Sequence, residues 1–311
     1  MSCALAARPS CYWEVQVTET LVQRRATLAR VGDFWALIKS RQTALLLITG
    51  FCAYTLTRGL PFDPLEAVWM AAGLLLSIGG CTVLNMLLDQ DIDGQMVRTA
   101  GRPLPAGRVQ PLEAGVFGGL LSATGLALSL RLDLRFGVIV ALGFAFDLLV
   151  YTVWLKRRTP LSIVFGGVAG GMPALAGRVL ALGRVDLVGL LLCGSILLWI
   201  PSHILTLVIR YADDYRRAGV PVWPNVYGPR ATRLFIAGAN LLNALVLAAC
   251  AFLLQVHPVT LVLLLGMSLG MFGFSTLQLV APTEQRNWLL FKIASLYMLT
   301  SSLLLTVGSL V

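Results

Sequence analysis

Nine long apolar stretches, separated by polar segments, constrain the fold of this chain more than any other feature. Each has about the 20 residues that a helix needs to cross the hydrocarbon core of a bilayer. Within lipid a spanning segment has to satisfy its own backbone hydrogen bonds, which favours helices. We therefore predict an all-α membrane protein with nine transmembrane helices. The predicted spans are 36–57, 66–88, 111–130, 135–155, 161–182, 185–209, 232–256, 258–280 and 287–310.

Composition and charge support this class and give an orientation. Charged residues make up 13% of the 311 residues, whereas a soluble domain has about 25%. The net charge of +9 could indicate nucleic-acid binding, but 19 of the 24 Lys and Arg residues fall on one side of the predicted spans. Positive residues accumulate on the cytoplasmic side. We predict a cell (inner) membrane protein without nucleic-acid partners, its N-terminus in the cytoplasm and its C-terminus on the opposite side.

The ends and the cysteines add little to this picture. Residues 1–33 have no apolar segment typical of a signal peptide, and we predict a cytoplasmic extension. Residues 34–311 then form a single nine-helix domain. The six cysteines are scattered without a CxxC pair, so we expect neither a disulfide nor a thiolate metal site.

Small residues recur at a spacing that favours close helix packing. Gly166 and Gly170 are four residues apart, as are Gly167 and Gly171, and Gly266 and Gly270 form a further pair. Such pairs let helices approach closely in lipid. A thin-walled cavity for a lipid tail is the alternative.

An acidic segment follows the second span and carries the clearest chemistry. Asn85, Asp89 and Asp93 are four residues apart, so on a helix they drift by only about 80° and share one face. Carboxylate and amide oxygens are ligands that Mg²⁺ accepts, and Mg²⁺ readily bridges to phosphate. We predict a Mg²⁺ site here. The alternative is an amphipathic helix end that pairs with nearby arginines.

Basic residues close to this segment could hold the oxygens of a diphosphate. Arg98 and Arg102 follow it directly, and Tyr151, Lys156 and Arg157 end the fourth span. Arg is suited to bidentate phosphate contacts. The alternative for both groups is a membrane anchor at the cytoplasmic surface.

A second acidic segment follows the sixth span. Asp213 and Asp214 offer a further metal or base site, although neighbouring residues on a helix face different directions. Tyr211 and Tyr215 are four residues apart, and their rings could shield a carbocation.

His203 lies inside the sixth span, next to Pro201. An ionisable residue at membrane depth is a functional candidate. It could act as a general base or ligate an iron. A hydrogen-bonded core imidazole is the alternative.

Taken together, the NxxxDxxxD pattern, the second acidic segment and the nine spans resemble the UbiA superfamily of intramembrane prenyltransferases, over residues 34–310. The strings NMLLDQDIDGQMVRTAGRPLPAGRV, YTVWLKRRTP and DDYRRAGVPVWP resemble its protoheme IX farnesyltransferase branch. The chain departs from that branch around His203, where it reads SHIL in place of the usual Pro-His-Phe-Trp. The segments that would bind the diphosphate match better than those on the acceptor side.

The resemblance implies helices around a central cavity, with a polar cap on the cytoplasmic side. It implies Mg²⁺-dependent transfer of a farnesyl or other polyprenyl group from its diphosphate to a hydrophobic acceptor in the bilayer. For this branch the acceptor is heme b and the product heme O. Alternatives are a quinone precursor or lipid as acceptor, a terpene cyclase without an acceptor and, more distantly, an ion-coupled transporter.

Overall fold

The computed structural model describes residues 27–311, and these form helices and turns without a β-strand. The prediction of an all-α protein is confirmed. Every predicted span matches a long helix or a continuous helical run, with ends that differ by at most four residues. These runs are α2 (Ser40–Arg58), α3 (Pro64–Leu88), α5 (Pro111–Leu132), α6 (Leu134–Ala145) with η1 (Phe146–Leu155), α7 (Ser162–Leu182), α8 (Leu187–Ile200) with η2 (Pro201–Leu205) and α9 (Thr206–Arg210), α12 (Gly228–Leu253), α13 (Pro258–Val280) and α14 (Glu284–Leu310).

Eight of these runs in residues 27–311 are long and apolar enough to cross a membrane. The ninth, α2, is 19 residues long but carries Arg41, Gln42 and Arg58 near its ends. These polar ends lower its mean hydropathy. The predicted number of nine spans therefore exceeds by one the number that length and apolarity alone support.

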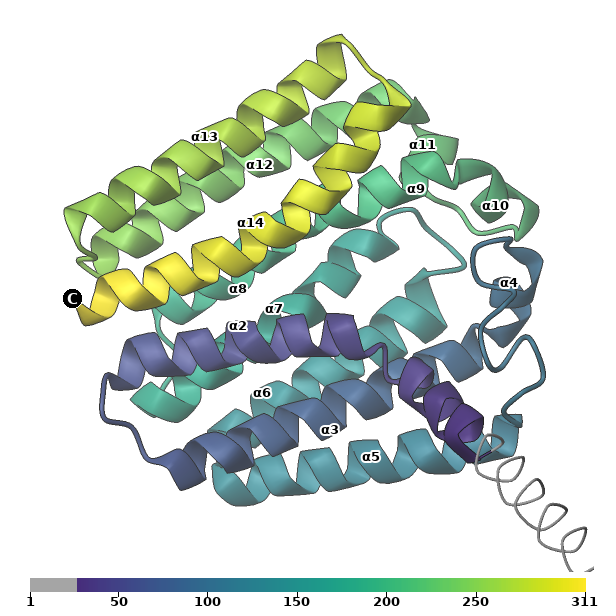
Figure 1. Cartoon of the computed structure of the whole chain (residues 1–311), viewed down its shortest axis with the longest axis horizontal. Helices are drawn as coiled ribbons and strands as arrows, with labels where there is room; N and C mark the ends of the chain where they lie inside the picture. Colours follow the sequence, from purple (N-terminus) through teal and green to yellow (C-terminus); the bar gives the residue numbers. More distant parts are fainter. Residues whose placement is uncertain (1–26) are drawn as a thin grey trace, which may run out of the picture.

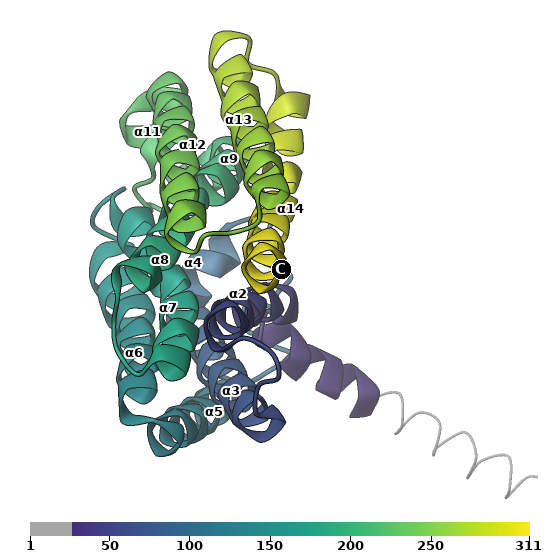
Figure 2. The ribbon, with the colours of Figure 1, turned by 90° about the vertical axis from the view of Figure 1, so that its left-hand side faces the viewer.

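The long helices form a ring (Figures 1 and 2). Each packs against the next along the chain, and α14 returns to contact α2. A further contact joins α2 to α7 across the ring. Each helix is apolar over most of its surface, and it buries one of its faces by packing against the neighbouring helices. This packing produces the ring.

Glycines allow the closest of these approaches. A Cβ at Gly177 of α7 would lie 2.1 Å from the carbonyl oxygen of Gly50 in α2. Gly171 lies against the backbone of Cys193 in α8 in the same way. The predicted packing role thus holds in α7. It is wrong for Gly266 and Gly270 of α13, because a Cβ at either would meet nothing within 4 Å in the described chain.

Three short helices gather at one end of the ring, opposite the C-terminus (Figure 1). They are α4 (Gln90–Gln95), α10 (Ala212–Arg217) and α11 (Trp223–Val226). Both α4 and α10 follow a long helical run after a single non-helical residue, Asp89 and Tyr211 respectively. The two acidic segments of the sequence therefore fold alike and lie at the same end of the molecule. Most of the predicted extension, 1–33, lies outside the described residues.

Candidate active site

The first acidic segment keeps its helical spacing across the break between α3 and α4. The Asp89 amide donates to the Asn85 carbonyl at 3.0 Å, and the Asp93 amide donates to the Asp89 carbonyl at 2.8 Å. All three side chains are buried, with Asp89 only 2% exposed. The structure therefore gathers Asn85, Asp89 and Asp93 on one inward face.

Each of these three residues already has a polar partner. Lys156 forms an ion pair with Asp89, and Arg102 pairs with Asp93 at 2.5 Å. The Asn85 side chain accepts from the Lys39 ammonium at 3.2 Å and donates to the Thr152 hydroxyl at 2.7 Å. Carboxylates buried beside apolar helices need such partners, because an unpaired buried charge is very costly.

Asp91 and Arg157 lie outside this cluster. Both carboxylate oxygens of Asp91 accept from Arg157 at 2.7 Å, and the two side chains are 59% and 45% exposed. The hydrogen bonds from Arg157 lower the pKa of the Asp91 carboxyl. Arg157 was predicted to hold phosphate, but in this structure it is committed to an outer ion pair.

The segment after α4 places its two arginines in different surroundings. The helix ends at Gln95, and residues 96–109 are turns. Arg102 consequently returns to Asp93, whereas Arg98 lies over the ring of Tyr211 at 5.6 Å from its centroid. This last contact joins the first acidic segment to the second.

The second acidic segment presents one carboxylate inward and one outward. Asp213 has a side chain that is 81% exposed and pairs with Arg216 at 2.8 Å. Asp214 is buried and pairs with Arg217, yet its Oδ2 has no hydrogen-bond partner. Tyr215 packs against the main hydrophobic core. Asp214 is thus the acidic residue of this segment that faces the interior.

A π-helix positions the basic end of the fourth helical run. In η1 the Lys156 amide donates to the carbonyl of Tyr151, five residues earlier, at 2.8 Å. In an α-helix, residues five apart would point about 140° away from each other. The π-helix instead brings them together, with the Lys156 ammonium 5.6 Å from the Tyr151 ring centroid. Burial by itself would lower the pKa of Lys156, but Tyr151 and Asp89 raise it.

Three residues behind this cluster were missed as site residues by sequence reasoning. Lys39 was taken for a topology signal, yet it reaches Asn85. Thr152 links Asn85 to the carbonyl of Asp147, to which its hydroxyl donates at 2.7 Å. The Asp147 carboxylate accepts from the Cys81 thiol at 3.3 Å. Asp147 could have been found, because a lone acid inside an apolar span is a functional signal.

His203 lies in the π-helical segment η2. Its ring is stacked between Trp199 and Phe291, with centroids 4.8 Å and 4.6 Å away. Its Nδ1 lies 3.2 Å from the Ser295 hydroxyl. The stack continues to Trp288, over which Arg210 lies at 4.7 Å. Pro201 is the first residue of η2, and the helical run continues through it.

The donor set fits a Mg²⁺ ion that also binds phosphate. In the described part of the chain, no three His, Cys, Asp or Glu side chains are grouped as a complete metal site. Mg²⁺ commonly uses only one or two carboxylates and takes its other ligands from water and substrate phosphate. The Oδ1 atom of Asp89 is buried and without a hydrogen-bond partner, so it is available for such a ligand. Asp89 and Asp93, assisted by Asn85, could hold the ion.

Known proteins resemble this chain in sequence and in fold. The UbiA prenyltransferase family model matches residues 46–299. A protoheme IX farnesyltransferase of Korarchaeum cryptofilum is 42% identical over 267 residues, which cover 86% of this chain and 90% of that protein. The corresponding Archaeoglobus fulgidus protein is 38% identical over 259 residues, covering 83% and 91%.

Solved structures agree on the fold. A digeranylgeranylglyceryl phosphate synthase has a TM-score of 0.75 at 20% identity, covering 91% of this chain and 99% of that one. A UbiA homologue of Archaeoglobus fulgidus bound to DMAPP and Mg²⁺ has a TM-score of 0.68 at 13% identity, covering 88% and 99%.

The chain thus combines a ring of long apolar helices with buried carboxylates that are paired with basic side chains. The family match and the relatives at 38–42% identity establish the class for this chain. It belongs to the UbiA prenyltransferase family, and it is an enzyme.

Proposed function

We propose that this protein transfers a farnesyl group from farnesyl diphosphate to heme b, giving heme O, with Mg²⁺ as cofactor. The observation that carries the proposal is the inward cluster of Asp89 and Asp93 with Lys156 and Arg102. It combines oxygen ligands for a divalent cation with cations for a diphosphate. The choice of heme b is supported by relatives at 42% and 38% identity that are named protoheme IX farnesyltransferase.

The residues of the cluster would act mainly on the leaving group. A bound Mg²⁺ would neutralise part of the negative charge that develops on the diphosphate. Lys156 and Arg102 would leave the carboxylates to bind phosphate oxygens, and Arg98, beside Tyr211, would approach from the second segment. The bond between the prenyl carbon and the diphosphate oxygen breaks, and its electron pair stays on the diphosphate. Fixed positive charge at that oxygen lowers the barrier.

The acceptor completes the reaction in the water-poor interior. A vinyl carbon of the acceptor would attack the allylic cation, and water would add to the cation that forms beside the macrocycle. Loss of one proton then leaves the hydroxyethylfarnesyl group. Tyr211 and Tyr215 would shield the allylic cation, and Asp214 would complete the polar end. His203 would lie beside the acceptor, as a base or as an iron ligand.

The proposal includes the orientation of the protein in the membrane. The N-terminus and both acidic segments would face the cytoplasm, where a water-soluble diphosphate headgroup can reach the site. A transporter is disfavoured, because transporter ion sites lie near the bilayer midplane, whereas the short helices α4 and α10 of the two acidic segments lie at one end of the ring (Figure 1).

A pair of aspartate variants tests the diphosphate site. Asp89→Ala should reduce diphosphate release by about 100-fold or more, as expected for loss of a main charge-stabilising contact. The matched control is Asp91→Ala, whose exposed side chain pairs only with Arg157 and should change turnover by less than about threefold. Near-normal turnover in Asp89→Ala would reject the metal role.

The acceptor is tested separately. Membranes containing the protein are incubated with farnesyl diphosphate, Mg²⁺ and heme b, and heme O is sought by mass spectrometry. Diphosphate release with a prenylated quinone or lipid would reject heme b but keep prenyl transfer. A free terpene without any acceptor product would indicate a cyclase.

A further inference from the structure

Four aromatic rings form a column that runs from the acidic end of the molecule toward its interior. The rings of Trp288, Phe291, His203 and Trp199 follow one another at centroid distances of 4.9, 4.6 and 4.8 Å, with interplanar angles of 15–18°. Trp288 lies in the second turn of α14. Trp199 lies about three turns before Arg210, the last residue of α9. The aromatic column therefore has an outer end at Trp288 and an inner end at Trp199.

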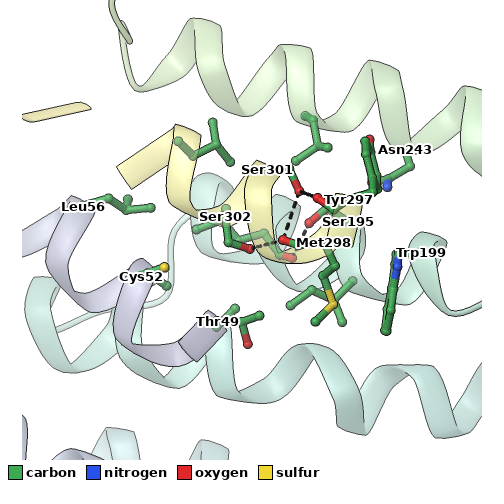
Figure 3. A pocket seen from close by; sticks show the side chains of 16 residues that line it. Thr49, Cys52, Leu56, Ser195, Trp199, Asn243, Tyr297, Met298, Ser301 and Ser302 are labelled. Atoms are coloured by element: carbon green, nitrogen blue, oxygen red, sulfur yellow. Dashed lines mark hydrogen bonds between the residues drawn. The ribbon is translucent and has the colours of Figure 1, made fainter. Parts of the chain in front are cut away.

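The inner end of the aromatic column is closed. Trp199 is 6% exposed and borders a cavity of about 20 Å³ (Figure 3), which has room for about one water molecule. A large acceptor beside His203 therefore finds no room beyond Trp199. Its bulk has to extend toward the outer end of the column.

Two cations stand at that outer end, on the indole of Trp288. The guanidinium carbon of Arg210 lies 4.7 Å from the indole centroid, and the ammonium of Lys292 lies 5.9 Å from it. Arg210 is 3.6 Å from Glu284, whose side chain is 75% exposed, so this ion pair is loose. Lys292 pairs with no carboxylate of residues 27–311. Both cations are thus available to an anionic ligand.

The edges of the column are the surfaces that a ligand can meet. The faces of His203 and Phe291 are covered by their neighbours in the stack, yet His203, Phe291 and Trp288 are only half-buried. An iron bound by an imidazole nitrogen lies in the plane of that ring. A macrocycle bound in this way would lie along the edges of the column and carry its substituents toward Trp288.

Heme b, the acceptor in the proposed function, carries two propionate carboxylates on one half of its macrocycle and two vinyl groups on the other. We propose that Arg210 and Lys292 form a subsite for these carboxylates, with the macrocycle along the edges of the aromatic column. The subsite turns the vinyl-bearing half toward the interior, where the prenyl cation forms. Hydrogen bonds between such cations and a carboxylate are the strong ones. This inference rests on the proposed transfer to heme b and adds a determinant of acceptor specificity.

The dimethyl ester of heme b tests the subsite, because it keeps the iron, the macrocycle and the vinyl groups and loses only the two carboxylate charges. Binding of each heme is followed by absorption titration of the protein in nanodiscs of zwitterionic phosphatidylcholine, without farnesyl diphosphate and corrected for empty nanodiscs. We expect the Kd of the ester to exceed that of heme b by about tenfold or more, as for the loss of charge-assisted hydrogen bonds. Equal Kd values would overturn the proposal.

Substitutions locate the effect. Arg210→Gln and Lys292→Gln should each raise the Kd of heme b about fivefold and leave that of the ester within about twofold. Arg210→Lys keeps the charge and should retain most of the preference. The matched control is Arg286→Gln, which removes a nearby cation that donates to the Ala281 carbonyl at 2.6 Å and should change neither Kd. An equal loss for both hemes in Arg210→Gln would make Arg210 a support of the column and contradict the subsite.

Mg²⁺-dependent binding of farnesyl diphosphate shows whether each variant is folded, since it depends on the carboxylate cluster and not on this subsite. If Arg210→Gln does not fold, the comparison of the two hemes on the unchanged protein still decides. Anionic lipid is the other possible ligand of the two cations. If Arg210→Gln reduces the amount of phosphatidylglycerol retained by the purified protein and leaves the preference for heme b intact, the cations hold lipid headgroups and the proposal is wrong.

Transfer assays with farnesyl diphosphate and Mg²⁺ tell the failure of the two proposals apart. If the unchanged protein forms no heme O from heme b, the proposed function fails, and the subsite fails with it. If heme O forms and the KM values of heme b and its ester are equal, the subsite alone is rejected. The expected result is heme O formation with a KM for the ester about tenfold or more above that for heme b.

Discussion

At the scale of single residues, the negative charges of the candidate site are neutralised by basic side chains of the same chain. Asp89 is paired with Lys156, Asp93 with Arg102, and Asp214 with Arg217. Two of these cations, Lys156 and Arg102, are also expected to bind the diphosphate. A metal ion arriving alone would compete with these cations for the carboxylates, whereas a metal that arrives with a diphosphate gives Lys156 and Arg102 the phosphate oxygens as new partners. Metal and diphosphate should therefore bind with positive coupling.

Lys156→Ala tests this exchange, because it should move two affinities in opposite directions. Freeing Asp89 should tighten the binding of Mn²⁺ alone, a spectroscopic substitute for Mg²⁺. Removing a phosphate ligand should weaken farnesyl diphosphate binding in the presence of metal about tenfold or more. Both are measured by titration, with Arg157→Ala as the control that should change neither substantially. A loss of both affinities would indicate a purely structural lysine.

His203→Phe keeps an aromatic ring in the stack between Trp199 and Phe291 and removes the two nitrogens. If His203 serves the acceptor, metal-dependent binding of farnesyl diphosphate should stay within about twofold, since the carboxylate cluster is untouched. Transfer to heme b should fall by about 100-fold, within the range of a lost acid–base group. The absorption spectrum of bound heme would show whether an axial nitrogen is also lost. Unchanged transfer would make His203 a packing residue.

At the scale of elements, the π-helix η1 sets the register of the site. It brings Lys156 back onto the face of Tyr151, and the carbonyl of Asp147 in the same element anchors Thr152. An α-helix over the same residues would turn Lys156 away from Tyr151. Such π-helical segments are frequent at functional sites.

Inserting one alanine after Val153 should turn Lys156 by about 100° relative to Tyr151. Val153 is 56% exposed on the outer surface, so the insertion itself meets little packing. We expect metal-dependent farnesyl diphosphate binding to weaken about as much as in Lys156→Ala. The control is deletion of Val153, which would let an α-helix place the lysine four residues after Tyr151, on the same face. Equal damage from both changes would contradict this role of the π-helix.

Sequence reasoning recovered the helices more completely than the site. The spans followed from apolar runs whose length the bilayer fixes, so their ends differ by few residues. The shared face of Asn85, Asp89 and Asp93 followed from helical periodicity, which the break at Asp89 left intact. Arg98 and Arg102 have different partners because α4 ends at Gln95, so the two arginines do not lie on one helix. The π-helices η1 and η2 leave no periodicity that short segments reveal, so the contacts of Lys156 and His203 required the structure.

At the scale of the whole molecule, both acidic segments lie at one end and the C-terminus at the other (Figure 1). If the acidic end faces the cytoplasm, an alkaline phosphatase fused after Val311 should be active, since that enzyme matures only outside the cytoplasm. A fusion within the loop at Gly107, between α4 and α5, should be inactive. Whole-cell phosphatase assays of the two fusions give the result. The reverse pattern would invert the proposed orientation.

Close approach of α2 and α7 across the ring should be essential to the fold. Gly177→Ala places a Cβ 2.1 Å from the carbonyl oxygen of Gly50, so the two helices would have to separate. We expect a loss of about 1–3 kcal/mol in stability, typical of overpacking, measured by thermal unfolding in detergent. Gly270→Ala, with nothing within 4 Å of its Cβ, is the control and should be neutral or slightly stabilising. Equal stability of both variants would contradict the packing argument.

The contact between α14 and α2 closes the ring between segments that are far apart in the sequence. The Thr306 hydroxyl donates to the carbonyl of Cys52 at 3.3 Å, across 254 positions. During synthesis α2 therefore waits for α14 before its side facing α14 is covered. Contacts between residues so far apart in the sequence form late in folding. Until they form, the uncovered helix surfaces can pack against wrong partners. Quality control in the cell would thus encounter a nascent chain whose enclosure depends on α14, a helix of 27 residues, so a truncation within α14 should be degraded before the protein can work.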